Sequence, residues 1–341
     1  AEDIQANGGP VTMESLAQYE AVPPIVVHGR YRGYDLTGTY VPAAGATTIQ
    51  ILQVLDHFDM ASMDEFQWAA VVSQAMRFGF QGSYRDAAAG DAEAALAITS
   101  PEAAAEIAAR IVVPEPAAMP AAASRGREVP VLAAADPASA QGVGLDDWIA
   151  RQHHTTHLST ADESGMMVAL TQTIGPNMGS KVATPGLGFL YAATLGGYLG
   201  DLEPGERARS AISPILVSRD GEPFLVLGAA GGGRIPPAVL QTIIRVIDQG
   251  MSLEDALAAP RLYARDEGEV DLEMTPGIAW SQDVVDGLES MGLEVSLQER
   301  AGAFGRVHAI MWDAEAGVWI GGADPDWEGS ADGPDDEPEG S

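Results

Sequence analysis

The sequence has 341 residues, and its 46% hydrophobic content is enough for the buried core of one large domain or two small ones. Its 49 acidic residues against 18 basic ones give a formal net charge of −31 at pH 7, so neither nucleic acid nor an anionic membrane surface is an expected partner. No run of about 18 apolar residues is present, so no membrane span is predicted, and the lack of cysteine excludes disulfides and thiolate metal sites.

The first hundred residues have the pattern of helices interrupted by one pair of short strands. In chain order we expect an amphipathic helix from Thr12 to Tyr19, strands at 25–27 and 34–36, a buried helix at 49–55, a long helix that ends near Phe80, and a helix that starts at Ser100. Ser62 and Glu65 have the spacing of a capping box, which makes Ser62 the expected cap of the long helix.

The rest of the chain changes character twice. Residues 113–145 are rich in Pro, Ala, Gly and Ser without periodicity, which is typical of a surface linker. Hairpins then follow at 156–174, 215–227 and 307–321, with helices at 236–248 and from Ser252 onward. Helices, a linker and then paired strands indicate an α+β layered fold. Residues 324–341 are acidic and poor in apolar side chains, so we expect a disordered tail.

A threonine pair stands where the linker meets the strands, in the run from Arg151 to His157 that reads Arg-Gln-His-His-Thr-Thr-His. A threonine hydroxyl is a poor nucleophile without a neighbouring base, but an N-terminal threonine can use its own α-amine. Cleavage of the chain before Thr155 would supply that amine. Taken alone, such a run is more often a set of polar residues at a strand edge.

Three histidines flank the threonines, and clustered imidazoles also suit zinc. No acidic partner at a recognisable spacing accompanies His153, His154 and His157. Solvated polar residues beside a cleavage loop are the plainer interpretation, so we expect no metal and no other cofactor.

A glycine-rich run, Gly228 to Arg234, lies between a predicted strand and a predicted helix. Backbone N–H groups at such a place can approach an anion closely, either a phosphate or the oxyanion of a tetrahedral intermediate. The run lacks the ending and spacing of a phosphate loop; its other interpretation is a tight turn. Ser210 and Ser213 lie in an ordinary turn sequence, and no Gly-x-Ser-x-Gly elbow predicts a serine hydrolase.

Together these stretches resemble the γ-glutamyltransferase family of N-terminal nucleophile hydrolases, over essentially the whole chain. The matching stretches are Gly8-Gly9 through Tyr19, Tyr31-Arg32-Gly33-Tyr34, Gln50 through Met60, Thr155-Thr156-His157, Ser213-Pro214, Gly231-Gly232 through Gly250, Ala259-Pro260-Arg261 and Ala323-Asp324-Pro325. Their order and spacing make the resemblance specific.

The resemblance implies a four-layered αββα sandwich and self-cleavage between His154 and Thr155. Residues 1–154 then form the end of a large subunit, and 155–323 form a small catalytic subunit that stays associated with it. Thr155 is the implied nucleophile, Thr173 its supporting threonine, Gly231 and Gly232 the oxyanion-binding pair, and Ser210 a group that holds the substrate's α-carboxylate. Ala1 matches the middle of the family's large subunit, so the N-terminal part of that subunit is missing.

Three residues depart from the family pattern. Gly175 stands where the family usually has an asparagine, Gly197 replaces the aspartate expected to bind the α-amine of a γ-glutamyl group, and Ala211 replaces a second serine. An ammonium group buried without its carboxylate loses binding free energy on the order of 3 to 5 kcal/mol. The sequence therefore weakens the expectation that glutathione is the donor.

We thus expect an autoprocessing threonine amidohydrolase that cleaves a γ-glutamyl or related acyl amide of a small molecule, with hydrolysis favoured over transpeptidation. The alternative is a catalytically silent or incomplete relative that acts as a binding or scaffold protein. Family analogy favours the periplasm or the cell exterior, although the N-terminus has no signal peptide. The acidic composition fits a high-salt host and a soluble secreted protein equally well.

Overall fold

The structure is a computed structural model that describes residues 1–21, 25–39, 43–82, 92–116, 153–176, 178–194, 210–264, 268–299, 301–327 and 329–333. Its helices are α1 (Glu2–Ala6), α2 (Met13–Gln18), α3 (Gly45–Leu55), α4 (Glu65–Gly82), α5 (Ala92–Ile98), α6 (Pro101–Ala108), α8 (Ile235–Ile247), α9 (Leu253–Ala258) and α10 (Gln282–Ser290), with short 3-10 turns at Met60–Ser62 and Gly232–Arg234. Its strands are β1 (Val26–Tyr31), β2 (Tyr34–Thr39), β3 (His153–Ala161), β4 (Met167–Pro176), β5 (Ile215–Arg219), β6 (Glu222–Ala230), β7 (Leu262–Ala264), β8 (Glu269–Thr275), β9 (Ile278–Ala279), β10 (Glu294–Gln298), β11 (Arg306–Asp313) and β12 (Val318–Ala323).

The central element is a six-stranded sheet in the order β1-β2-β5-β6-β11-β12, antiparallel throughout. It contains strands from both sides of residues 117–152, because β2 pairs with β5 from Asp35 opposite Ser218 to Gly38 opposite Ile215. A smaller sheet has the order β10-β8-β7, with β9 paired to β8. Strands β3 and β4 form a separate hairpin.

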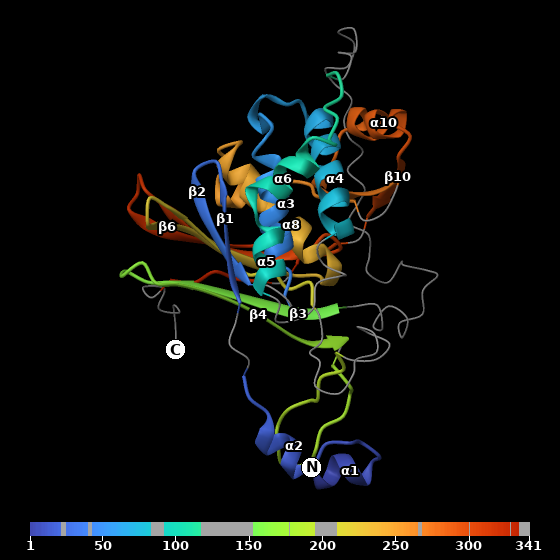
Figure 1. The fold of residues 1–341 in the computed structure, drawn as a ribbon, viewed down its shortest axis with the longest axis vertical. Coiled ribbons are helices and arrows are strands. Elements are labelled where there is room, and N and C mark those ends of the chain that lie inside the picture. Colours follow the sequence, from blue (N-terminus) through green and yellow to red (C-terminus); the bar gives the residue numbers. More distant parts are fainter. Residues whose placement is uncertain are drawn as a thin grey trace.

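Helices cover one face of the six-stranded sheet and the β3–β4 hairpin covers the other (Figure 1). Helix α3 is buried along its whole length because it lies between β1 and β2 and the helices α4, α6 and α8. The last six residues of β6, 225–230, are all buried because α8 packs on one side of this strand and the hairpin on the other. The fold is thus an α+β sandwich whose two strand layers meet at β6.

Short-range sequence features explain most of these elements. Thr12 and Ser15 form the capping box of α2, and Ser100 accepts the Ala103 N–H at the start of α6. The β5–β6 turn uses Asp220 and Gly221, both with positive φ, as a two-residue hairpin turn requires. The predicted helices and hairpins at these places are confirmed.

The predicted cap of α4 is wrong by two residues. Asp64 accepts the Gln67 N–H at 2.7 Å while the Gln67 side chain accepts the Asp64 N–H at 3.3 Å, so these two residues form the box. Ser62 instead ends a 3-10 turn, where its hydroxyl donates to the Asp59 carbonyl. Both pairs have the same spacing, and the extra turn before the helix decides between them.

The sequence analysis missed one group of elements and assigned one residue wrongly. The elements between residues 262 and 298, which include the smaller sheet and α10, were not predicted. Asp324, assigned to the disordered tail, is 3% exposed because its carboxylate pairs with Arg261. Most of the predicted linker 113–145 lies outside the described residues, as does 334–341.

The outer face of the β3–β4 hairpin is apolar. Leu158, Val168 and Leu170 are each about half exposed on it, while the alternate residues face the six-stranded sheet. Within the described residues no second helical layer covers this face (Figure 1). None of the described helices is both long and apolar enough to cross a bilayer.

Candidate active site

Thr155 lies on β3 directly opposite Thr173 on β4. Both side chains are partly buried, whereas their neighbours Thr156 and Gln172 are exposed, so both threonines face the six-stranded sheet. The Thr173 hydroxyl accepts the Gly175 N–H at 3.1 Å. The structure therefore brings together the implied nucleophile and its supporting threonine, across a single pair of strands.

The bond between His154 and Thr155 lies within the first residues of β3. The register with β4 shifts between His153 and Thr155, so the strand is irregular at this place. The sequence had placed the bond where the linker meets the strands; the structure puts it beside an irregularity in the β3–β4 pairing. The side chains of His153 and His154 lie outside the described residues.

His157 is 5% exposed and lies on the same face of β3 as Thr155. One ring nitrogen, Nδ1, is 2.7 Å from the Thr171 hydroxyl, and Nε2 is 2.9 Å from the Ser159 hydroxyl. Burial, with a smaller contribution from His308, lowers the pKa of His157 to about 4, so the ring is neutral at pH 7. The interpretation of this residue as solvated is therefore wrong, because strand alternation puts it inside.

Gly228 on β6 lies against the His157 ring. A Cβ atom at Gly228 would stand 2.5 Å from His157 Nδ1, closer than Cβ atoms approach other heavy atoms in proteins, so the ring or the strand would have to shift. Only a glycine lets the imidazole sit between the two strand layers. Since His157 is two residues from Thr155, this contact fixes the position of the candidate nucleophile relative to β6.

Strand β6 leads directly into Gly231 and Gly232, which have φ values of 142° and 61°. Such backbone angles favour glycine, and they turn the chain from the strand into the first turn of α8. The N–H groups at a helix start are available to an anion. The loop 231–233 is therefore chemically suited to an oxyanion, and it lies at the end of the strand that packs on β3.

Arg234 anchors this loop. Its Nη1 donates to the Ala303 carbonyl at 2.8 Å and its Nη2 pairs with Asp271. The guanidinium also lies over the Tyr263 and Phe304 rings, 5.3 Å and 4.8 Å from their centroids. The loop is thus attached to the smaller sheet and to the segment before β11.

The substrate-binding residues implied by the sequence are only partly described. The Ser210 hydroxyl accepts the Ile212 N–H at 3.3 Å, just before β5. Gly175 has φ 92°, and a Cβ atom there would stand 2.7 Å from the Ala193 carbonyl oxygen. The main chain at Ala193 therefore occupies the space of a side chain at this position. Gly197 lies outside the described residues.

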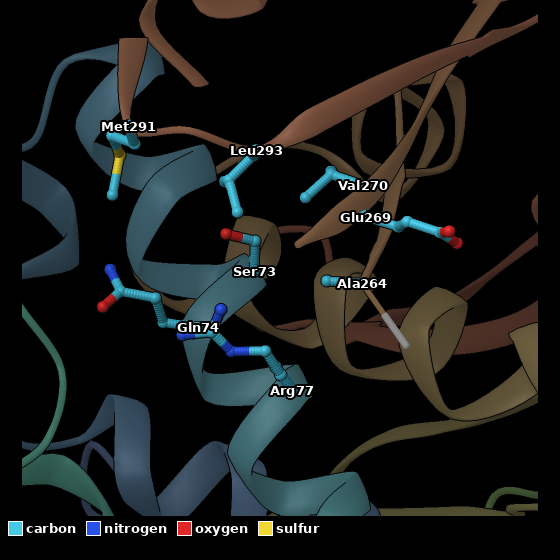
Figure 2. A pocket seen from close by; sticks show the side chains of 8 residues that line it. All are labelled: Ser73, Gln74, Arg77, Ala264, Glu269, Val270, Met291 and Leu293. Atoms are coloured by element: carbon cyan, nitrogen blue, oxygen red, sulfur yellow. The ribbon is translucent and has the colours of Figure 1, made fainter. Parts of the chain in front are cut away.

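A separate small pocket lies where α4 approaches the smaller sheet (Figure 2). Its lining residues are Ser73, Gln74, Arg77, Ala264, Glu269, Val270, Met291 and Leu293. The Ser73 hydroxyl donates to the Ala70 carbonyl, and the Gln74 amide bonds the Val112 backbone in both directions. The carboxylate of Glu269 points away from the other side chains (Figure 2). The buried polar side chains of this pocket, Ser73 and Gln74, therefore already have hydrogen-bond partners within the protein.

A sequence model of the gamma-glutamyltranspeptidase family matches residues 1–333. The chain belongs to this family. The resemblance stated from the motifs and the expected N-terminal nucleophile hydrolase fold are both confirmed.

Individual relatives agree with this assignment. The glutathione hydrolase proenzyme of Escherichia coli (strain K12) is 30% identical over 95% of this chain and 55% of its own length. The acylase ACY 1 proenzyme of Pseudomonas sp. (strain V22) is 29% identical over 92% of this chain and 52% of its own length. The solved cephalosporin acylase from Bacillus halodurans has the same fold, with a TM-score of 0.68 and 24% identity over 96% of this chain and 57% of that one. The chain thus spans about half the length of these relatives.

Proposed function

We propose that this chain matures by cleavage between His154 and Thr155 and then transfers acyl groups from small-molecule amides through Thr155. The observation that carries the proposal is the position of Thr155, which faces the β6 layer opposite Thr173 and two residues from a buried, fixed imidazole. The glycine loop at the end of β6 supplies donors for the developing negative charge. Relatives with proenzyme names support a self-processed enzyme.

In the proposed reaction the Thr155 Oγ forms a bond to the amide carbonyl carbon, and its proton passes to the freed α-amine of the same residue. The N–H groups of Gly231 and Gly232 stabilise the oxyanion of the tetrahedral intermediate. Collapse breaks the amide bond, and the leaving amine takes the proton. Water then attacks the acyl ester by the same route in reverse, which regenerates Thr155 and releases the acid.

The acyl donor is a γ-glutamyl amide or another acyl amide, with Ser210 as a group that binds a donor carboxylate. Both classes of named relative, a glutathione hydrolase and an acylase, are similarly close to this chain. The Ala193 main chain beside Gly175 leaves no room for the asparagine expected in a γ-glutamyl pocket. We favour hydrolysis over transpeptidation, since the sequence identifies no site for an acceptor amine.

The two pieces would stay associated after cleavage. Strands β1 and β2 precede Thr155, while β5, β6, β11 and β12 follow it, and all six belong to one sheet. Helix α3, also before Thr155, is wholly buried against this sheet and α8. Separation would expose that interface and the unpaired edges of β2 and β5, at a large cost in free energy.

The test is the intact mass of the purified protein at high salt, beside Thr155→Ala and Thr156→Ala variants. We expect two fragments that sum to the precursor in the wild type and in Thr156→Ala, and one uncut mass in Thr155→Ala. The cleaved protein is then assayed with γ-glutamyl and other acyl amides. One uncut mass in all three proteins would contradict the proposal and support a silent relative.

A further inference from the structure

The segment Ala301–Gly305, called here the backing segment, lies behind the glycine loop. Strands β6 and β11 pair with Ala230 opposite Arg306, so the residues just before β11 lie beside those just after β6. A Cβ atom built at Gly231 would be 2.8 Å from the Gly305 Cα atom. The loop therefore rests on the backing segment with no space between them, and a shift of one moves the other.

Three charged side chains from three parts of the fold hold the backing segment through its main chain. Arg234 donates to the Ala303 carbonyl at 2.8 Å, and Arg261 donates to the Gly305 carbonyl at 3.3 Å. At the other end, Asp326 accepts the Gly302 N–H at 2.6 Å. Since it belongs to no helix or strand, its position depends on these three bonds and on its buried Phe304 ring.

Asp326 differs from the two arginines because its charge can change near neutral pH. Its Oδ1 atom is buried without a hydrogen-bond partner, and the Asp324 carboxyl group lies close enough to act on its charge. Burial first, and then the bond to Asp324 and the charge of that residue, raise the pKa of Asp326 to about 7. Two neighbouring carboxyl groups cannot both ionise cheaply.

The other charges near this pair do not remove the conflict. Arg261 is committed to Asp324, with 2.6 Å between Nη1 and Oδ2. Glu273 adds a further negative charge, and its carboxylate already accepts the backbone N–H of Arg261 at 2.9 Å. His308, on β11, lies near both Asp324 and Arg306.

We propose that Asp326 is a positioning residue for the oxyanion-binding loop: its proton bridges the two carboxyl groups and keeps Gly302, and with it the backing segment, against Gly231 and Gly232. Loss of the proton places two negative charges in contact. Asp326 then turns toward solvent and releases the Gly302 N–H. The part of this inference that concerns catalysis rests on the proposed function, and it predicts a fall in kcat with little change in KM as the loop loses its support.

The size of the effect follows from linkage. If the released carboxyl group has the ordinary pKa of 3.8 and the held one a pKa of about 7, the equilibrium between release and holding shifts about tenfold between about pH 6 and about pH 8. An amide in place of the Asp326 carboxyl group removes this dependence on pH, because an amide does not titrate. Asp326→Asn keeps an oxygen for the Gly302 N–H and gains an N–H that can donate to Asp324.

The test is hydrogen–deuterium exchange of peptides that cover residues 299–307, in the Thr155→Ala background, at about pH 6 and about pH 8, with intrinsic exchange rates divided out. We expect protection to fall about tenfold with pH when Asp326 is present and to stay constant in Asp326→Asn. Asp326→Ala, which removes both bonds, should lower protection at both pH values. Asp313→Asn is the matched control, because Asp313 accepts two N–H groups in the exposed β11–β12 turn.

Equal pH dependence of protection with and without Asp326 would overturn the inference. The readout needs no activity, so it separates this inference from the proposed function. If the exchange results are as expected but the wild-type chain never cleaves, only the proposed enzymatic function is refuted. Turnover whose kcat has the same pH profile in Asp326→Asn as in the wild type would refute only the role of Asp326.

Discussion

Asp324 and Arg261 form a buried ion pair whose removal is the sharpest perturbation the structure offers. The two atoms that pair, Arg261 Nη1 and Asp324 Oδ2, are 2.6 Å apart, and both side chains are 2% exposed. Asp324 also accepts the Val307 N–H at 3.1 Å. The substitution Asp324→Asn keeps the volume and this last hydrogen bond, but it removes the negative charge that compensates the guanidinium.

Loss of one partner of a buried pair typically costs about 3–5 kcal/mol, because the other charge stays in a low-dielectric site. Arg261 would keep its bonds to the carbonyls of Leu257 and Gly305, and the carboxyl groups of Glu273 and Asp326 would remain close to it. These groups offset part of the penalty. We therefore expect a loss of about 3 kcal/mol in the free energy of unfolding.

The assay is urea unfolding followed by circular dichroism, in the Thr155→Ala background so that all chains are uncut. The matched control is Asp35→Asn, because Asp35 pairs with Arg30 at 2.9 Å with the two side chains 46% and 73% exposed. An exposed pair contributes about 0–1 kcal/mol and is screened by salt. A loss in Asp324→Asn no larger than in Asp35→Asn would refute the reasoning about burial.

Three further predictions concern the hairpin and its neighbours. The pKa of His157 is about 4 in the folded state, below the ordinary 6.5, so the unfolded state binds a proton first as the pH falls. The free energy of unfolding should therefore decrease between about pH 6.5 and about pH 4, and His157→Asn should reduce that decrease. Gly228→Ala should destabilise the fold by about 1–3 kcal/mol and slow cleavage before Thr155, because the new methyl group meets the imidazole. Gly175→Ala should cost more than Gly221→Ala: both residues have positive φ, but only Gly175 faces a carbonyl oxygen at 2.7 Å.

Each of these has a result that contradicts it. If the free energy of unfolding of His157→Asn falls with pH as steeply as that of the wild type between about pH 6.5 and about pH 4, other groups control stability in that range. Combining Gly228→Ala with His157→Ala should recover part of the loss, and strict additivity of the two substitutions would argue against their contact. Equal unfolding midpoints for the two remaining alanine variants would show that the Ala193 main chain moves aside.

The sequence predicted the features that depend on neighbouring residues. Thr12, Ser100 and Ser252 cap helices as expected, because a cap needs only the residues two or three positions on. The turn at Asp220 and Gly221 was evident for the same reason. The family was evident from motif order, and with it the candidates Thr155, Thr173, Gly231 and Gly232, although nothing in the sequence placed the strands that carry them against each other.

Long-range packing decided the rest. His157 looks like any polar residue near a predicted cleavage site until Gly228, on another strand, is found to make room for it. Arg261 and Asp324 are 63 positions apart, and only the meeting of their segments turns two surface-type residues into a buried ion pair. The sequence by itself determined the family and the candidate chemistry, because local patterns carry them; the tertiary structure alone decided burial and partnership, since these depend on which distant residues the fold brings into contact.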